Sequence, residues 1–181
     1  MNEKLELTSI QGEKVILRPI TLEDTALIVR WRNNPLVRRN FIFQESFSEE
    51  MHRKWMNSKV ASGEVVQYII EIKEHQKPVG SVYIRDIDYH HHSAEYGIFI
   101  GEDDARGLGI GTETAKLFVR HMFKMLGLHR IFLRVFEDNI QACNSYKKAG
   151  FIQEGIGRDM VQIDGQYKNV VFMSVLESEM V

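Results

Sequence analysis

Cysteine and proline are scarce in this sequence, whose 181 residues include one cysteine, Cys143, and three prolines. A lone cysteine excludes a disulfide framework and a multi-cysteine zinc site. No stretch approaches the roughly 20 apolar residues of a membrane-spanning helix, and the first ten residues lack the apolar core of a signal peptide. The 23 basic and 25 acidic residues nearly balance, which excludes a generally basic nucleic-acid-binding surface. We therefore expect one domain over residues 1–181, in the cytoplasm, without membrane or nucleic-acid partners.

Glycine is present in an ordinary amount but is unevenly placed. Only 13 of the 181 residues are glycine. Five of them fall within fifteen positions, namely Gly97, Gly101, Gly107, Gly109 and Gly111. Glycine allows backbone conformations and close approaches that other residues disfavour, so this clustering is the first indication of a site.

Hydrophobic periodicity predicts an α/β fold with a mixed central sheet of about seven strands. The expected strands are residues 14–20, 65–72, 78–87, 94–101, 130–136, 151–163 and 167–176. Helices are expected from Thr21 to about Asn33, from Ser48 onward, over 109–127 and over 139–149. The order is β-α-α-β-β-β-α-β-α-β-β, and the β-α-β unit over 93–136 makes its two strands parallel.

The segment Arg106-Gly-Leu-Gly-Ile-Gly-Thr112 joins a predicted strand to a long predicted helix. Exposed N–H groups at a helix start, approached closely through glycines, form an anion site that suits a pyrophosphate. A glycine-rich turn that merely connects the two elements is an equally simple interpretation. No Gly-Lys-Ser/Thr follows, so the segment is not a P-loop, and its spacing does not fit a dinucleotide fingerprint.

Asn139 and Tyr146 lie seven residues apart on one face of a predicted helix, roughly 10 Å apart along its axis. Taken alone, Asn139 is most simply a helix cap and Tyr146 a half-buried aromatic residue.

Together the two segments resemble a known family. Arg106-x-x-Gly109-x-Gly111 is similar to the (Gln/Arg)-x-x-Gly-x-(Gly/Ala) motif of the GNAT acetyltransferase superfamily. Asn139-x-x-Ala-x-x-x-Tyr146-x-Lys-x-Gly-Phe resembles its second motif. The resemblance covers about residues 13–177 and is nearest to the branch of ribosomal-protein-alanine, spermidine and nucleotide-aminosugar N-acetyltransferases. It implies the GNAT (acyl-CoA N-acyltransferase) fold.

The resemblance implies direct transfer of an acetyl group from acetyl-CoA to a primary amine. The strand 95–100 would splay from 130–136, with pantetheine in the gap. Segment 106–112 would hold the pyrophosphate, and an N–H near Ile98 or Phe99 would stabilise the oxyanion. The implied cofactor-binding residues are Ile98, Phe99, Ile100, Arg106, Gly107, Leu108, Gly109, Ile110, Gly111, Thr112, Asn139, Tyr146 and Lys148.

Two catalytic roles follow from the same resemblance. Tyr146 would protonate the leaving thiolate as general acid. Glu95 is the first candidate for the base that deprotonates the amine, directly or through water, and a purely structural carboxylate is the alternative. Glu137 and Asp138 are the second candidates, with a solvated strand end as their simpler interpretation.

The acceptor pocket would be framed by residues 31–47 and by the hairpin of the last two strands. The implied substrate-binding residues are Trp31, Arg32, Asn33, Phe41, Phe43, Arg158 and Tyr167. Aromatic and arginine side chains suit a nucleotide-linked aminosugar, and the tail near Tyr167 is more similar to spermidine acetyltransferases. An aminosugar nucleotide or a polyamine is therefore expected. A protein N-terminus as the peptide acceptor, or a non-catalytic acyl-CoA-binding module, is the alternative.

Three further features carry little chemistry. The consecutive residues His90–His92 cannot easily converge on one metal ion, so we expect a hairpin turn and no metal site. Cys143 lies inside a predicted helix and reads as a small buried residue. A homodimer is plausible through exposed strand edges, although no motif specifies it.

Overall fold

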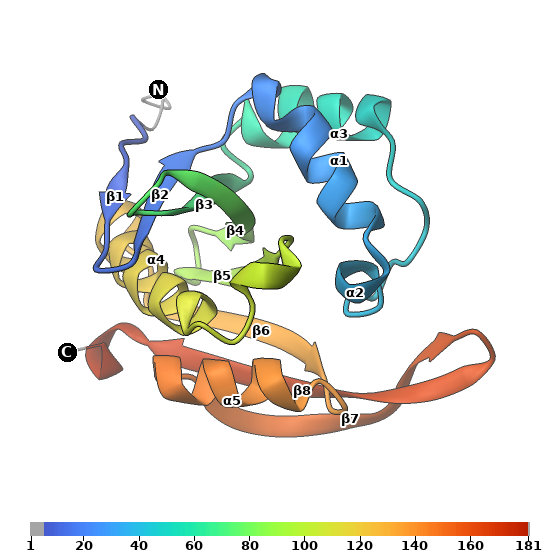
Figure 1. Ribbon diagram of the computed structural model, residues 1–181. Helices are drawn as coiled ribbons and strands as arrows, with labels where there is room; N and C mark the ends of the chain where they lie inside the picture. The colour runs from blue at the N-terminus through green and yellow to red at the C-terminus, as the bar shows by residue number, and fades with distance from the viewer. Residues whose placement is uncertain (1–5, 181) are drawn as a thin grey trace.

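Eight strands form one mixed sheet in the computed structural model, which describes residues 6–180 (Figure 1). The strands are β1 (Ile10–Gln11), β2 (Val15–Pro19), β3 (Val66–Ile72), β4 (Lys77–Asp88), β5 (Ser93–Ile100), β6 (Arg130–Phe136), β7 (Ile152–Ile163) and β8 (Gln166–Leu176). The helices are α1 (Thr25–Asn33), α2 (Pro35–Arg38), α3 (Glu49–Trp55), α4 (Ile110–Leu126) and α5 (Ile140–Ala149). Short turns η1 (Leu22–Asp24), η3 (Asp103–Ala105) and η4 (Glu177–Glu179) are 3₁₀-helical, and η2 (Met56–Val60) is π-helical.

The seven predicted strands are all present, and the sheet gains the two-residue strand β1. This strand pairs antiparallel with β2 and is too short to show a period in the sequence. The predicted helix end at Asn33 is confirmed, because Asn34 is extended and its side chain accepts a hydrogen bond from the Leu36 backbone N–H at 3.0 Å. That cap starts α2, which the sequence reading did not predict. The Asp164-Gly165 turn is also confirmed, since both residues have positive φ.

The helices lie on opposite faces of the sheet. On one face, the first three helices and their flanks pack a cluster of Ile20, Ile28, Trp31, Val37, Met56, Ile69 and Phe99. On the other face, α4 supplies Phe118, Val119 and Met122 to the main core, to which α5 and β6 also contribute. Because each helix buries one apolar stripe, the two faces need separate cores.

The strand pairing opens in the middle of the sheet. Strands β5 and β6 are parallel, as predicted, but they pair only over Ser93–Glu95. On its other side β5 stays paired with β4 as far as Ile100. Strand β6 in turn pairs with β8 along its whole length. The predicted splay is therefore confirmed, and residues 96–100 of β5 present an edge that no strand of the described chain covers.

Candidate active site

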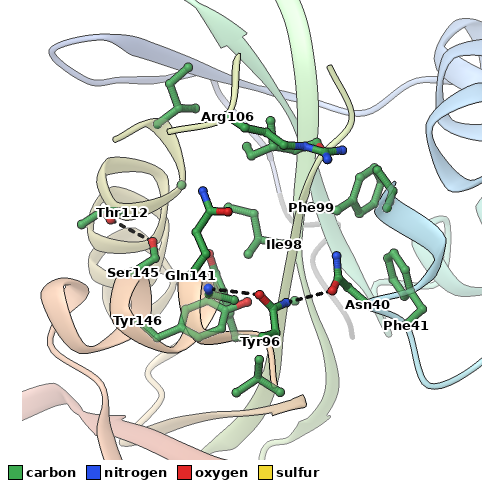
Figure 2. Close-up of a pocket in the computed structure, with 18 of the residues that line it drawn as sticks. Asn40, Phe41, Tyr96, Ile98, Phe99, Arg106, Thr112, Gln141, Ser145 and Tyr146 are labelled. Atoms are coloured by element: carbon green, nitrogen blue, oxygen red, sulfur yellow. Dashed lines mark hydrogen bonds between the residues drawn. The ribbon is translucent and has the colours of Figure 1, made fainter. Parts of the chain in front are cut away.

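A cavity of about 670 Å³ occupies this opening. Its lining comes mainly from β5, the glycine-rich segment 105–112, α5 and the segment 36–43 after α1, with further residues from α1, β4 and β6. Figure 2 shows Gln141, Ser145 and Tyr146 on one side, Asn40, Phe41 and Phe99 on the other, and Ile98 between them. The sheet opening thus brings together segments far apart in the sequence.

The glycine-rich segment needs glycine for its backbone shape. Gly107 and Gly109 have φ values of 77° and 80°, the left-handed region that other residues rarely adopt. The segment turns at Gly109, and α4 begins at Ile110. The start of this helix therefore lines the cavity. The Arg106 guanidinium donates to the Ile100 carbonyl at 3.2 Å and pairs with Asp103 at 3.1 Å, which fixes the segment to the end of β5.

The first turns of α5 form the facing wall. Asn139 caps the helix, because its Oδ1 accepts from the Ala142 backbone N–H at 3.2 Å. Its Nδ2 donates across the cavity to Asn40 Oδ1 at 3.1 Å. A hydrogen bond of 2.8 Å between the hydroxyls of Thr112 and Ser145 joins α4 to α5. The capping role predicted for Asn139 is confirmed, and Asn40 is a partner that sequence reasoning missed.

The described structure places most of the predicted cofactor residues in the cavity wall. The members that line it are Ile98, Phe99, Ile100, Arg106, Gly107, Gly109, Ile110, Gly111, Thr112, Asn139, Tyr146 and Lys148. Leu108 is the exception, since its side chain is exposed and its carbonyl accepts from Lys14 Nζ at 3.5 Å.

Tyr146 is held by aromatic contacts. Its ring packs edge-on against Tyr96 and Phe151, at centroid distances of 6.1 and 5.8 Å. Burial raises the pKa of Tyr146 well above its usual range, so the hydroxyl is protonated at neutral pH. A protonated hydroxyl in the cavity wall has the state that a general acid requires.

Glu95 is paired with two arginines. Its Oε1 accepts from Arg134 Nε at 2.8 Å and its Oε2 from Arg85 Nε at 3.0 Å. Burial opposes ionisation of this carboxyl, but the two guanidinium groups outweigh it and lower its pKa. A base with a lowered pKa takes a proton poorly at neutral pH. The pairing therefore favours the alternative interpretation, in which Glu95 fixes Arg85 and Arg134 in the cavity wall.

The second candidate bases make contacts at the end of β6. Asp138 pairs with Lys168 at 2.6 Å, and Glu137 accepts from Asn169 Nδ2 at 2.8 Å. Neither carboxylate lines the cavity. Both therefore match the interpretation as an exposed strand end.

Tyr83 is a cavity residue that sequence reasoning missed. It faces Gly97 across the β4–β5 ladder, and a Cβ built on Gly97 would lie 2.2 Å from the Tyr83 ring. Burial raises the pKa of the Tyr83 hydroxyl, despite the nearby charges of Arg85 and Arg32. A glycine opposite an aromatic residue within apolar strands was the available signal. Arg85 and Arg134 gave a similar signal, because each is a charged residue within an apolar strand sequence.

Arg32 is the most unusual charged group of the cavity. Its guanidinium carbon lies 3.6 Å from the ring centre of Phe41 and 5.1 Å from that of Phe47. Its Nε is buried without a hydrogen-bond partner among the described residues. Burial lowers the pKa of Arg32, and the charge of Arg85 acts in the same direction. Arginine nevertheless stays charged in proteins, so this cation is poorly compensated.

Of the other predicted acceptor residues, Phe41 and Phe43 line the cavity and four do not. Trp31 is 1% exposed in the core and donates to Glu102 at 2.7 Å. Asn33 makes two hydrogen bonds with the backbone of Phe47, at 2.8 and 2.9 Å. These corrections have one reason: α1 turns Trp31 and Asn33 inward, so they support the segment 34–47 instead of lining the cavity.

The tip of the β7–β8 hairpin extends beyond the end of β6, at the right of Figure 1. Arg158 and Tyr167 are exposed on it, Tyr167 at 63%. Neither lines the cavity, so the predicted acceptor contact is not formed within the described chain. The hairpin is long, and its residue pattern gives no information on where its tip lies relative to the cavity. This accounts for the difference between the prediction and the structure for Arg158 and Tyr167.

The histidine run lies in the predicted hairpin turn, and the lone cysteine is buried in the predicted helix. His90–His92 lie in the turn between β4 and β5, where His91 pairs with Asp88 at 2.7 Å. Cys143 is buried in α5 near the Phe136 carbonyl. In residues 6–180, no three His, Cys, Asp or Glu side chains are grouped to hold a metal ion. Within the same range, no helix is both long and apolar enough to span a bilayer.

Comparison with known proteins decides the family. The model of the acetyltransferase (GNAT) domain matches residues 14–152. The chain belongs to the GNAT acetyltransferase family. The predicted GNAT fold is confirmed, and this GNAT protein is an acetyl-CoA-dependent N-acetyltransferase.

Its relatives include spermidine acetyltransferases. The spermidine N(1)-acetyltransferase of Escherichia coli K12 is 28% identical over 168 residues, which cover 93% of this chain and 89% of that protein. The crystal structure of spermidine N-acetyltransferase from Vibrio cholerae, in complex with CoA and spermine, superposes with a TM-score of 0.86 at 25% identity, over 92% of this chain and 98% of that one. An uncharacterised protein of Methanocaldococcus jannaschii is 31% identical over 82% of this chain, which spans 30% of that longer protein.

Proposed function

We propose that this GNAT protein acetylates the primary amine of a small molecule that also carries an anionic group, such as an aminosugar nucleotide. The observation that carries the proposal is the half-buried Arg32 in the cavity wall, whose buried Nε has no hydrogen-bond partner among the described residues. Leaving a charge buried without a counter-charge is costly, and a phosphate or carboxylate on the acceptor would supply one.

The cavity lining as a whole supports an anionic ligand. Its basic side chains are Arg32, Arg39, Arg85, Arg106, Arg134 and Lys148, and its acidic side chain among the described residues is Glu95. Coenzyme A accounts for part of this charge, through the phosphates expected near Arg106 and Lys148. Arg32 and Arg39 lie in other segments, without a carboxylate partner among the described residues, and remain available to the acceptor, whereas Arg85 is paired with Glu95.

The residues present fit acetyl-CoA. The uncovered edge of β5 offers backbone groups to an extended pantetheine arm, and the glycine backbone at 107 and 109 leaves room at the start of α4 for a pyrophosphate. When bound, acetyl-CoA supplies the thioester whose carbonyl carbon the amine attacks. The backbone N–H near Ile98 or Phe99 stabilises the negative oxygen that develops, and Tyr146 gives its hydroxyl proton to the sulfur as the carbon–sulfur bond breaks. The amine nitrogen loses its proton to water, and Tyr146 regains one from water.

A polyamine is the second candidate, because the spermidine acetyltransferases are similar over most of their length. A polycationic acceptor would have to enter beside Arg32, Arg85 and Arg134 with one opposing carboxylate, Glu95. Like charges at that distance oppose binding. The charge of the lining therefore favours the anionic acceptor. The cytoplasmic location and the homodimer stay predictions.

An acceptor screen tests the proposal. The purified protein is given acetyl-CoA with glucosamine 6-phosphate, UDP-glucosamine, spermidine, spermine or peptides that begin with Ala or Ser, and thiol release is followed. We expect turnover with the phosphorylated amines. Turnover with spermidine or with the peptides, and none with the phosphorylated amines, would contradict the proposal.

Arg32→Gln provides the matched variant. Loss of the guanidinium should lower kcat/KM for the phosphorylated amine about tenfold to a hundredfold and leave the KM for acetyl-CoA within about twofold. Arg30→Gln is the control, because Arg30 lies on the same helix, pairs with Glu102 and does not line the cavity. An equal loss in both variants would show that Arg32 acts through the fold.

A further inference from the structure

A second, smaller hollow of about 140 Å³ adjoins the acceptor side of the main cavity. It shares Arg32, Tyr83, Arg85 and Phe99 with that cavity. Its other walls come from α1, α3, β3 and the segment before α3, through Ile28, Phe47, His52, Trp55 and Gln67. The shared residues make it an extension of the acceptor side, reached past Arg32.

His52 lines this hollow, and one of its ring nitrogens has no hydrogen-bond partner among the described residues. The side chain is 1% exposed, and its Nδ1 lies 3.0 Å from Thr25 Oγ1. The Thr25 hydroxyl donates its hydrogen to the Leu22 carbonyl at 2.7 Å. Thr25 Oγ1 must therefore accept from His52, so the imidazole hydrogen is on Nδ1. Nε2 is left as a lone-pair acceptor without a partner in the described chain.

Burial also keeps His52 neutral. Removal from water lowers the pKa of its imidazole, and this outweighs the charge of nearby Asp24, which acts in the opposite direction. The imidazole therefore offers a hydrogen-bond acceptor to the hollow at neutral pH.

The polar groups of Gln67 and Trp55 are already satisfied. Gln67 accepts from Trp55 Nε1 at 3.2 Å and donates to Ser81 Oγ at 2.9 Å. Of the side chains described around the hollow, Arg32 Nε and His52 Nε2 are the buried polar atoms that lack a partner. The hollow is thus lined by one cationic donor and one neutral acceptor without partners, together with the Tyr83 hydroxyl and the aromatic rings of Phe47 and Trp55.

We propose that this hollow is an acceptor subsite for a hydroxyl or amide group, which donates to His52 Nε2 while its oxygen accepts from Arg32 Nε. The terminal nitrogens of the same guanidinium remain for the anionic group of the acceptor. An ammonium group would be repelled by Arg32, and a phosphate or carboxylate has no hydrogen to give to His52. A hydroxyl or amide meets both requirements, so a hydroxyl-bearing amine such as an aminosugar fits and a simple amine does not. The inference rests on the proposed function and specifies which part of the acceptor His52 recognises.

Two probes that differ in hydroxyl groups test the subsite. Glucosamine 6-phosphate and phosphoethanolamine both join a primary amine to a phosphate, but the first also carries sugar hydroxyls. Binding of each to the CoA-loaded protein is measured by calorimetry. We expect the wild-type protein to bind glucosamine 6-phosphate at least about tenfold more tightly. Equal binding of the two probes overturns the subsite, whatever the folding of any variant.

His52→Leu removes the acceptor nitrogen, and His52→Gln restores an acceptor oxygen. The first should weaken binding of glucosamine 6-phosphate about three- to tenfold, leave phosphoethanolamine unchanged, and be partly rescued by the second. His121→Leu is the matched control, since His121 is a half-buried histidine of α4 outside both cavities. If His52→Leu weakens the binding of both probes equally, or of neither, His52 only binds water or stabilises the fold, and the subsite is overturned.

The two proposals fail separately. Acetyl transfer to spermidine and not to either phosphorylated amine contradicts the anionic acceptor. Unselective binding of the two probes contradicts the subsite, even if both are acetylated.

Discussion

At the scale of single residues, the site depends on side chains whose surroundings set their chemical state. Tyr146 is kept protonated by burial, and Glu95 is kept ionised by Arg134 and Arg85. The two groups that a direct transfer would use as acid and base are thus unequal. The structure favours Tyr146 as the acid and gives Glu95 the task of holding two arginines in place.

Removal of the Tyr146 hydroxyl should slow the reaction with little effect on binding. For Tyr146→Phe we expect kcat to fall roughly 10²- to 10³-fold, because the leaving sulfur loses its proton donor, while the KM for acetyl-CoA changes less than about threefold. Steady-state kinetics measure both. Tyr89→Phe, at an exposed turn tyrosine, is the control. An unchanged kcat for Tyr146→Phe would rule out the acid role.

Gly97 makes room for Tyr83, so a side chain there should disturb the acceptor side. Gly97→Ala places a Cβ 2.2 Å from the Tyr83 ring and should lower the free energy of unfolding by about 1–3 kcal/mol, together with acceptor kcat/KM. Gly155→Ala is the control in β7, because nothing lies within 4 Å of its added Cβ. Denaturant unfolding and steady-state kinetics compare the two variants. Equal effects of Gly97→Ala and Gly155→Ala would contradict the role of Gly97 in making room for Tyr83.

At the scale of elements, the site is made by ends: the end of β5, the start of α4 and the start of α5. A hydrogen bond between Thr112 and Ser145 joins the start of α4 to the middle of α5, and Arg106 joins the glycine-rich segment to β5. These hydrogen bonds hold the connecting segments in place, so their backbone groups can bind a ligand although they are not paired in the sheet. The long amphipathic helix α4 supplies the rigid support, with its apolar stripe buried in the main core.

The glycine-rich segment should lose its ligand when Gly109 gains a negative side chain. Gly109→Asp combines a positive φ of 80° with a carboxylate at the expected pyrophosphate site, and should weaken CoA binding at least about tenfold by calorimetry. Gly63→Asp has the same backbone strain, at φ 78°, in open space away from the cavity. Equal CoA affinity in the two variants would contradict the pyrophosphate assignment.

At the scale of the whole molecule, one sheet runs through residues 10–176 and carries both helix layers. Its first half is tied to the helical layer by Arg18, which pairs with Asp24 and Glu71, each at 2.7 Å. Burial opposes ionisation of Asp24, but the hydrogen bonds from Arg18 and Thr21 outweigh it, so the pKa of Asp24 is lowered.

This tie gives the stability a defined pH dependence. Since the folded pKa of Asp24 lies below its unfolded value of about 3.9, its stabilisation is complete above that value and is lost as the pH falls through the folded pKa. Asp24→Asn should therefore lower the free energy of unfolding by about 2 kcal/mol at pH 6 and by less at pH 3. Urea unfolding at both values measures this. Asp164→Asn, in the exposed turn, is the control, and an Asp24→Asn effect that does not shrink at pH 3 would contradict it.

Local pattern fixes much of this protein from its sequence. The glycines at 107 and 109 are required by positive φ, the amphipathic period of α4 sets a buried stripe, and Asn139 caps α5 through its own neighbours. These features depend on residues a few positions apart, so the two family motifs and the cofactor side of the cavity are readable from the chain alone.

The acceptor side depends on contacts between distant residues. Tyr83 reaches the cavity because β4 pairs with β5 in the register that sets it opposite Gly97, and Arg32 rather than Trp31 faces the cavity because α1 packs its tryptophan under Gly101. His52 Nε2 lacks a partner because Nδ1 donates to the Thr25 hydroxyl, which itself donates to the Leu22 carbonyl. Thr25 and Leu22 lie in other elements than His52. The sequence thus determines the elements and the chemistry of acetyl transfer. Only the packing of those elements, which sets register, burial and unpaired polar atoms, decides what the acceptor side can recognise.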